Sequence, residues 1–526
     1  MKKTLAGLVL AAAAAIFPSG CSKETEIQTQ FQDRYLNPIA QMKYVKDDGS
    51  LAAFYVNNGT DIETFVFNSA SNAFSNVSND PDFTDYPAGF LGNDVVAISY
   101  SPDGSVQKLK IFTSNGVFVS DECEEFNDVV INSSNFMFEV ENNNDQDVMT
   151  FNPATGLFEK VVPHSNESYI QAVSKDGSVA LIKGYDSYSG YTVYMRKDGV
   201  LTPLINLSGH YGEAISDDNK KAYIRFSSGG EGIKVVDVDT QNIQTFNAPS
   251  TFDWTNVSKV SPDGLSAIVN AEENGFSNDR YYRLDTATGT WTYICDENNF
   301  FVADISGDGV LTVFQGGFYG SDVRLFNAST PEFYMPVSTT LYSNQSFLGF
   351  TSNNKALITG NDTSTWNLEC ILHDPATKTN TLLGDSVNYE IDYVAELSPN
   401  KEYVALNSRE IATGYDAVQL VDLIGTQNHL IKQTGFDVRY TGMSPDNSRV
   451  YVQSIGMGAS NLLSYDLQTQ TFTQITNHAD RRVDWFTILG QSNDGGILYF
   501  EEYHENGTKE ILEYESASGL VTKISN

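Results

Sequence analysis

A turn rich in Ser, Asp, Asn and Gly recurs along almost the whole chain and separates short runs of β-branched and aromatic residues. Its spacing is about 41 to 48 residues, which is the length that four short antiparallel strands need. The eight clearest copies begin at Ser174, Ser216, Ser261, Ser306, Ser352, Ser398, Ser444 and Ser492, and fainter copies begin at Asp47, Gly92 and Ser133. We therefore predict an all-β chain of tandem β-propellers with about eleven four-stranded antiparallel blades.

A second turn motif, Asp/Asn-x-x-Thr/Gly, has the same period and supports this prediction. It occurs, for example, at 285–289, 374–377 and 466–469. An Asp or Asn side chain accepts backbone N–H bonds in such turns, and Gly tolerates a positive φ. The turn at 101–104 is out of phase, and we expect it to lie between two strands of the second repeat.

Eleven blades exceed the four to eight that one ring usually holds. The repeats lengthen near residue 250, so we predict two rings, with about five blades in residues 35–250 and about six in residues 251–526. A split into four and seven blades is the alternative. In either case each ring would close by packing whole blades together, because the chain starts with an inner strand and ends with an outer one.

The N-terminal segment resembles a bacterial lipoprotein signal. Two lysines precede an apolar stretch that is too short to span a bilayer, and Ser19-Gly20-Cys21 follows. The resemblance implies a signal peptide at residues 1–21, lipidation of Cys21, a tether at residues 22–34, and an outer-membrane lipoprotein that faces the periplasm or the cell surface. An ordinary secretory peptide with an incidental Cys is the alternative.

Net charge excludes one class of partner. The whole chain carries a formal charge of −35, and removal of residues 1–21 takes away two lysines and no acid. Such a surface repels nucleic acid and favours cations or basic partners, although it also serves solubility. Cys123, Cys295 and Cys370 have no short spacing, so we expect neither a disulfide framework nor a zinc knuckle.

One passage carries a family resemblance. Phe472-Thr473-Gln474-Ile475-Thr476-Asn477-His478 is followed by Asp480, by Asp484-Trp485 and by the Ser492 turn. This phrase resembles the TolB-type propeller repeats that also occur in dipeptidyl-peptidase-like and tricorn-like proteins, and the resemblance extends over residues 35–526. The α/β domain of TolB and the catalytic domain of the peptidases have no counterpart in the sequence, so the resemblance implies an architecture and not an activity.

Linear motifs of common enzymes are absent from the sequence, which has no Gly-x-Ser-x-Gly, no His-Glu-x-x-His and no phosphate loop. The six histidines show no ligand spacing, and we interpret most of them as solvated loop residues. We predict no metal ligands and no cofactor. Bound calcium stays open at 142–147, where oxygen-rich side chains lack the order of a calcium loop.

Acidic residues recur about eight positions before the turn serine, at the predicted start of the inner strand. Because inner strands surround the axis of a propeller, we expect these acids to form part of a carboxylate ring at one mouth of the channel, together with aromatic and basic neighbours. The predicted binding residues are Asp253, Trp254, Glu390, Asp437, Arg439, Tyr440, Arg481, Asp484 and Trp485. The alternative is that each Asp caps its own loop.

These observations predict a lipid-anchored envelope protein that acts as a non-catalytic binding or scaffold module for a protein, a peptide or a glycan. One alternative is a carbohydrate-active lyase or hydrolase that uses channel carboxylates, because acid–base chemistry needs only two placed groups and leaves no linear motif. Another alternative is a structural subunit of an envelope or secretion complex.

Overall fold

The computed structural model describes residues 39–525 apart from short segments at 58–61, 72, 79–81, 115, 132–135, 143–144, 154, 188–189, 207–208, 228–229, 274–279, 297–299, 317–321, 426–427, 457–458, 479–482 and 506. Within these residues the chain forms strands β1 to β44, which group in chain order into blades 1 to 11 of four strands each. The predicted all-β fold of tandem four-stranded antiparallel blades is therefore confirmed.

Each blade runs from an inner strand to an outer strand. The first strands are β1 (Ile39–Val45), β5 (Thr84–Leu91), β9 (Glu125–Ile131), β13 (Glu167–Val173), β17 (His210–Ile215), β21 (Phe252–Val260), β25 (Phe300–Ile305), β29 (Tyr342–Phe350), β33 (Tyr389–Leu397), β37 (Asp437–Met443) and β41 (Val483–Gln491). The second strands are β2 (Leu51–Asn57), β6 (Asp94–Tyr100), β10 (Phe136–Asn142), β14 (Val179–Asp186), β18 (Lys221–Phe226), β22 (Ser266–Glu273), β26 (Leu311–Gly316), β30 (Ala356–Asp362), β34 (Tyr403–Glu410), β38 (Arg449–Gly456) and β42 (Ile497–His504).

The outer half of each blade is its last hairpin. The third strands are β3 (Ile62–Asn68), β7 (Gln107–Thr113), β11 (Asp145–Asn152), β15 (Gly190–Lys197), β19 (Gly232–Asp237), β23 (Arg280–Asp285), β27 (Asp322–Asn327), β31 (Leu368–Asp374), β35 (Asp416–Asp422), β39 (Ala459–Asp466) and β43 (Lys509–Glu515). The fourth strands are β4 (Ala73–Asn76), β8 (Gly116–Val119), β12 (Leu157–Lys160), β16 (Val200–Asn206), β20 (Ile243–Asn247), β24 (Thr290–Cys295), β28 (Glu332–Tyr334), β32 (Thr379–Leu383), β36 (His429–Ile431), β40 (Thr471–Gln474) and β44 (Leu520–Ser525).

The repeated turn joins the first and second strands of a blade, and its chemistry is local. In blade 6 the buried Ser261 hydroxyl donates a hydrogen bond to Asp263 at 2.7 Å and accepts one from the Ser266 N–H at 3.0 Å. Gly264 completes the turn with a φ of 65°, a conformation that favours glycine. In blade 8 Thr351 takes the place of this serine by donating to Asn353, so the turn starts one residue earlier than the predicted Ser352.

The hydrophobic core is divided among the joints between blades. Each of eleven buried clusters combines side chains of two neighbouring blades. The cluster at the 5–6 joint, for example, contains Tyr223 and Ile233 from blade 5 with Val269 and Leu284 from blade 6. A blade therefore buries its two faces against its neighbours, as repeat architectures require.

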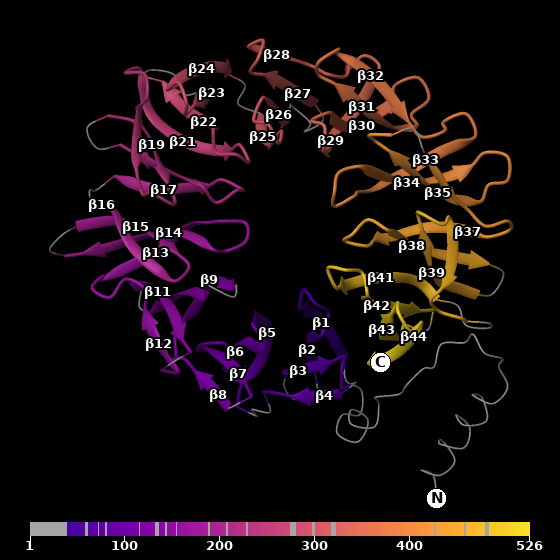
Figure 1. The fold of residues 1–526 in the computed structure, drawn as a ribbon, viewed down its shortest axis with the longest axis horizontal. Helices are drawn as coiled ribbons and strands as arrows, with labels where there is room; N and C mark the ends of the chain where they lie inside the picture. Colours follow the sequence, from indigo (N-terminus) through magenta and orange to yellow (C-terminus); the bar gives the residue numbers. More distant parts are fainter. Residues whose placement is uncertain are drawn as a thin grey trace, which may run out of the picture.

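The eleven blades form one ring, in which blade 11 lies beside blade 1 (Figure 1). Tyr499 of blade 11 donates a hydrogen bond to the Gly49 carbonyl of blade 1 at 3.0 Å, just as Tyr223 of blade 5 donates to the Gly264 carbonyl of blade 6 at 2.7 Å. The first and last blades thus meet through the same contact that joins blades 5 and 6.

The predicted division into two rings at residue 250 is wrong in this structure. A ring of residues 35–250 would need blade 5 to pack against blade 1, but blade 5 packs against blade 6, and blade 1 packs against blade 11. The expectation that whole blades close the ring without exchanging a strand is confirmed, because β1–β4 and β41–β44 each form a complete sheet.

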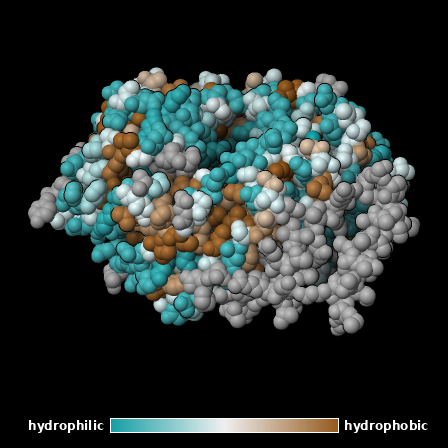
Figure 2. Space-filling model, turned by 60° about the horizontal axis from the view of Figure 1, so that its bottom comes forward, coloured by the Kyte–Doolittle hydropathy of each residue, from teal (hydrophilic) through white to brown (hydrophobic). Residues whose placement is uncertain are grey.

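Surface polarity varies around the ring. Hydrophilic side chains cover much of its rim, and hydrophobic side chains gather on the outer wall that Figure 2 brings forward. Val117, Val119 and Leu157, on the outer strands β8 and β12, are among the exposed apolar residues. In the part of the chain that the structure describes, no helix is both long and apolar enough to cross a bilayer.

Candidate binding site

The predicted acids lie at the start of inner strands, as expected, three of them on consecutive blades and the fourth on a blade elsewhere in the ring. Asp253 belongs to blade 6, whereas Glu390, Asp437 and Asp484 belong to blades 9, 10 and 11 (Figure 1). Asp253, Glu390 and Asp484 are exposed, and no hydrogen bond or ion pair joins the four acids to one another among the described residues. Arg481 and Cys21 lie outside the described residues.

Three predicted residues of β37 instead take part in a network between blades 9 and 10. Arg439 Nε lies 2.8 Å from an oxygen of Asp416, and Asp437 accepts a hydrogen bond from the Asp416 N–H at 3.0 Å. The Tyr440 hydroxyl donates a hydrogen bond to Glu396. The pKa of Tyr440 is raised, mainly by burial and then by this contact with Glu396. Asp437 therefore binds the neighbouring blade and does not cap its own loop, which was the alternative interpretation.

Both predicted tryptophans contact aromatic or cationic neighbours. Trp485 stacks on Tyr503 with ring centroids 3.9 Å apart and is 47% exposed. The Arg225 guanidinium lies over the Trp254 ring, 5.6 Å from the ring centroid. Arg225 also lines a hollow between blades 4 and 5, which was not predicted from the sequence.

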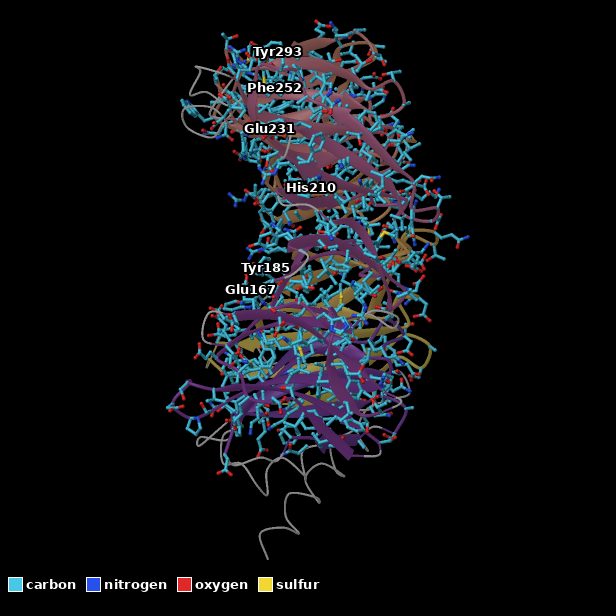
Figure 3. The ribbon with its side chains drawn as sticks, turned by 90° about the vertical axis from the view of Figure 1, so that its left-hand side faces the viewer. Glu167, Tyr185, His210, Glu231, Phe252 and Tyr293 are labelled. Atoms are coloured by element: carbon cyan, nitrogen blue, oxygen red, sulfur yellow. The ribbon has the colours of Figure 1, made fainter. Side chains whose placement is uncertain are left out.

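This hollow has a volume of about 480 Å³ and lies where the first three strands of blade 4 meet the first two strands of blade 5. Figure 3 shows Glu167, His210 and Phe252, which begin the inner strands of blades 4, 5 and 6, following one another along the ring. The polar side chains and tyrosines that line the hollow are Tyr169, Gln171, Lys183, Tyr191, Tyr211, Glu213 and Arg225.

Aromatic rings and cations alternate through the hollow. The Lys183 ammonium lies 3.5 Å from the ring centroid of Tyr211 and 4.5 Å from that of Tyr191. The Arg225 guanidinium lies 4.7 Å from the centroid of the same Tyr211 ring. Strand register explains this order, because Tyr211 is directly opposite Arg225 in the β17–β18 pair, and β14, which carries Lys183, belongs to the neighbouring blade.

Lys183 is a cation without an acidic partner. Its residue is only 7% exposed, and among the described residues it makes no ion pair and no side-chain hydrogen bond; its contacts are with the two tyrosine rings. Burial, and then the charge of Arg225, lowers its pKa. A buried ammonium without an anion is unfavourable, so the site favours an anion from outside the chain.

Glu213 is the acid of the hollow, and it is committed to Arg225. Its Oε1 lies 3.0 Å from Arg225 Nε, and its side chain is 11% exposed. Burial raises its pKa to about 7, and the neighbouring Arg225 opposes this shift. Near neutral pH this carboxyl is therefore able to hold or release a proton.

Comparison of the repeats distinguishes Lys183 from Arg225, because Arg225 donates a hydrogen bond to the Thr255 carbonyl on the inner strand of the next blade at 3.3 Å. Lys183 and Arg225 lie nine residues after the turn serine of their blades, and the residue at this position is an amide in four other blades: Asn270, Gln315, Asn407 and Gln453. In three of these blades the amide bridges to the inner strand of the next blade, as when Asn407 Oδ1 accepts from the Tyr440 N–H at 2.8 Å.

Blade 4 makes this bridge with another residue, because Gln171 Oε1 accepts from the Gly212 N–H at 2.6 Å. Lys183 is thus free of the bridging role that this position has elsewhere. Comparison of equivalent positions between repeats was the signal in the sequence that could have found the site.

The histidines were also misinterpreted. His210, His373, His429 and His504 are buried, so the interpretation of most histidines as solvated loop residues is wrong. Cys123, Cys295 and Cys370 are all buried, and none of them forms a disulfide within the part of the chain that the structure describes.

Comparison with known proteins gives the fold and no more. No family model matches the chain, and no curated protein matches it. Among solved structures, dipeptidyl peptidase 4 from Porphyromonas gingivalis is 11% identical with a TM-score of 0.34, and the match covers 73% of this chain and 57% of that chain. TolB from Acinetobacter baumannii is 13% identical with a TM-score of 0.26, over 60% of this chain and 84% of that one.

An oligogalacturonate lyase from Vibrio parahaemolyticus is 9% identical with a TM-score of 0.27, over 64% of this chain and 96% of that one. Neighbours of these kinds agree with the predicted resemblance to TolB-type and dipeptidyl-peptidase-like propeller repeats. At this level of similarity, the shared feature is the propeller blade alone.

Proposed function

We propose that the protein is an envelope-anchored, non-catalytic binding module that takes an acidic saccharide into the hollow between blades 4 and 5. The observation that carries the proposal is the Lys183 ammonium, which is buried against Tyr191 and Tyr211 and has no acidic partner in the part of the chain that the structure describes. A carboxylate on the ligand would supply the missing charge.

The aromatic content of the hollow favours a sugar over an inorganic anion. Tyrosine faces offer flat apolar surfaces with polar tips, on which a sugar ring stacks. Tyr169, Tyr191 and Tyr211 line the hollow together with Gln171, whose amide N–H groups can donate to a sugar hydroxyl. A volume of about 480 Å³ is within the usual range of small-ligand sites.

Because the protein is strongly acidic, binding of an acidic ligand requires cations at the site itself. With a formal charge of −35, the molecule repels polyanions over a distance. An acidic saccharide would therefore bind only where Lys183 and Arg225 create a positive region, and the affinity should depend on salt less than it does for an exposed basic patch, because buried charges are screened less.

The decisive experiment is calorimetry with uronic-acid oligosaccharides and with neutral oligosaccharides of equal length. We expect binding of the acidic series, and a loss of about 10- to 100-fold in Lys183→Gln, because charged hydrogen bonds contribute about 1.5–3 kcal/mol. Lys234→Gln is the matched control, since Lys234 lies over Phe226 in the same part of the ring but outside the hollow. Equal affinity in both variants, or equal binding of neutral sugars, would refute the proposal. Preference for an acidic peptide would identify a different ligand class.

A lyase or hydrolase is the second candidate, because Glu213 has a pKa of about 7 beside two cations. Such a carboxyl can act as a general base near neutral pH. Incubation of the acidic oligosaccharides with the wild-type protein and with Glu213→Gln separates the two functions. New reducing ends or unsaturated products that depend on Glu213 would establish catalysis, whereas intact ligand after prolonged incubation supports binding alone.

Anchoring at Cys21 is the remaining part of the proposal. It rests on the sequence pattern Ser19-Gly20-Cys21 after a short apolar stretch. Incorporation of labelled fatty acid into the wild-type protein, and its loss in Cys21→Ala, would support lipidation. Labelling that persists in Cys21→Ala would contradict it.

A further inference from the structure

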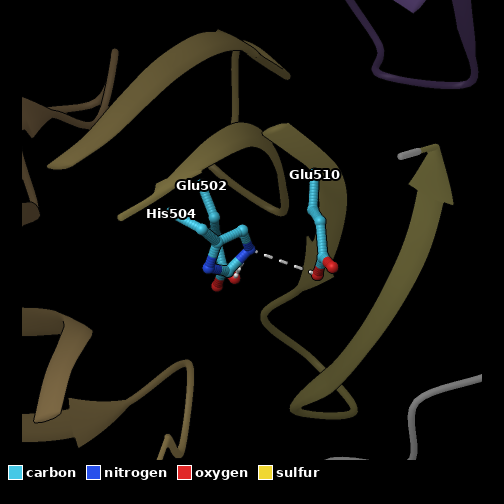
Figure 4. A group of neighbouring side chains, drawn as sticks. All are labelled: Glu502, His504 and Glu510. Atoms are coloured by element: carbon cyan, nitrogen blue, oxygen red, sulfur yellow. Dashed lines mark ion pairs between the residues drawn. The ribbon is translucent and has the colours of Figure 1, made fainter. Parts of the chain in front are cut away.

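Three titratable side chains meet inside blade 11, outside the candidate binding site. Glu502 and His504 lie on β42 with one residue between them, and Glu510 lies opposite Glu502 in the β42–β43 pair (Figure 4). Glu502 is fully buried, His504 is 3% exposed and Glu510 is 6% exposed. Their ligand atoms all lie within 4.8 Å of one another.

In both glutamates, the two carboxylate oxygens contact different partners. Oε1 of Glu502 lies 2.9 Å from His478 Nε2, and Oε1 of Glu510 lies 3.0 Å from Lys523 Nζ. The Oε2 atoms of both glutamates face His504 Nε2, at 3.7 Å and 3.6 Å. One oxygen of each group is thus held by an outer partner, and the other is directed toward a common centre.

The spacing at that centre is wrong for hydrogen bonds and right for a metal ion. A hydrogen bond between these atoms needs a separation below about 3.2 Å. In a tetrahedral shell with bonds of about 2.0–2.2 Å, two ligand atoms are about 3.3–3.6 Å apart. The separations of 3.6 Å and 3.7 Å are close to this second value. Moreover, the buried Oε2 of Glu502 has no hydrogen-bond partner among the described residues.

We propose that Glu502 Oε2, His504 Nε2 and Glu510 Oε2 bind one divalent transition-metal ion, with zinc as the preferred ion and water as the fourth ligand. Imidazole and carboxylate together suit zinc and its first-row neighbours, whereas calcium and magnesium prefer oxygen alone. His478 and Lys523 are positioning residues that orient the two carboxylates through their Oε1 atoms, as outer partners commonly do at metal sites.

The ion would link the central hairpin of the last blade. β42 and β43 carry Tyr499 and Ile511, which form the joint with blade 1. Because bound metal stabilises the folded state, occupancy would strengthen the blade on which ring closure depends.

The test is metal loading of the purified full chain, stripped with a chelator and then dialysed against zinc. We expect about one zinc per chain by mass spectrometry, a visible spectrum of tetrahedral cobalt after substitution with Co²⁺, and a rise in Tm of at least about 2 °C on zinc addition. Glu502→Gln and Glu510→Gln should each lose the metal and the rise in Tm. Glu501→Gln is the matched control, because Glu501 is the neighbouring residue on β42 and pairs with Lys509.

Two results would overturn the proposal. One is a folded wild-type protein that takes up less than about 0.1 zinc or cobalt per chain, which would identify the cluster as ion pairs of protonated histidine. The other is equal loading of Glu501→Gln, Glu502→Gln and Glu510→Gln, which would place the metal elsewhere. If both cluster variants fail to fold, His478→Gln keeps the test open, because it removes an outer partner and should weaken the affinity by about 10- to 100-fold without removing a ligand.

Discussion

A disulfide across the joint between blades 11 and 1 would test the single ring directly. The Asn493 N–H donates to the Asp47 carbonyl at 2.8 Å, and both residues are exposed. Backbone groups bonded in this way have Cα atoms within about 7 Å, which is near the range that a disulfide spans. We therefore expect the Asp47→Cys/Asn493→Cys protein to form an internal disulfide under mild oxidation.

The size of the expected effect follows from the length of chain that the disulfide encloses. Residues 47 and 493 are about 450 positions apart, so the chain-entropy relation gives a stabilisation of about 6 kcal/mol. Two comparison pairs enclose only about 45 to 50 residues, Asp218→Cys/Pro262→Cys at the 5–6 joint and Ser352→Cys/Lys401→Cys at the 8–9 joint. For each of these pairs the relation gives about 4 kcal/mol.

Electrophoresis without reductant is the assay, because a disulfide that encloses almost the whole chain makes the denatured protein more compact. The native thiols are buried and should not compete. In one ring all three pairs close. If the chain formed two rings split at residue 250, only the pair at residues 352 and 401 would close, and this result would refute the single ring.

Two further predictions concern stability. Tyr223→Phe and Tyr499→Phe should each lower the free energy of unfolding by about 1–2 kcal/mol in urea denaturation, because each leaves a Gly carbonyl without its hydroxyl donor. Tyr451→Phe should lower it less, since the Tyr451 hydroxyl has no hydrogen-bond partner among the described residues. A larger loss of stability in Tyr451→Phe would contradict this reasoning. Burial raises the pKa of Glu213 and of Glu513 from 4.5 to about 7. The folded state therefore binds more protons than the unfolded state between those pH values, and stability should fall as pH rises through this window, by up to about 1.4 kcal/mol per pH unit for each carboxyl. Glu213→Gln and Glu513→Gln should flatten the pH profile, and a wild-type profile that rises in this window would refute the assignment.

The blades could be predicted from the sequence because their turns are encoded by neighbouring residues. Ser261, Asp263 and Gly264 complete one turn through their own hydrogen bonds and conformation. The number of blades in a ring depends instead on the angle at which whole blades pack, which is set by side chains such as Tyr223 and Leu284 on different repeats. No contiguous motif encodes that angle, so the closure of one ring was not predicted.

The candidate site was missed for a related reason. A search for acids selected Asp253 and Asp484, but the hollow owes its chemistry to cations that replace bridging amides at one position of the repeat. Lys183 and Asn407 occupy that same position, but the Lys183 ammonium lies against the Tyr211 ring of the next blade, whereas the Asn407 amide accepts a hydrogen bond from the Tyr440 N–H. Among the predicted residues, Trp254 contacts a residue that lines the hollow, Arg225.

Because blade 11 meets blade 1 through the same kind of contact that joins blades 5 and 6, the location of the chain ends is incidental to the architecture. A circularly permuted gene that starts at residue 251, with a short linker from residue 525 to residue 39, should give the same ring. That linker would connect blade 11 to blade 1, just as residues 248–251 connect β20 of blade 5 to β21 of blade 6.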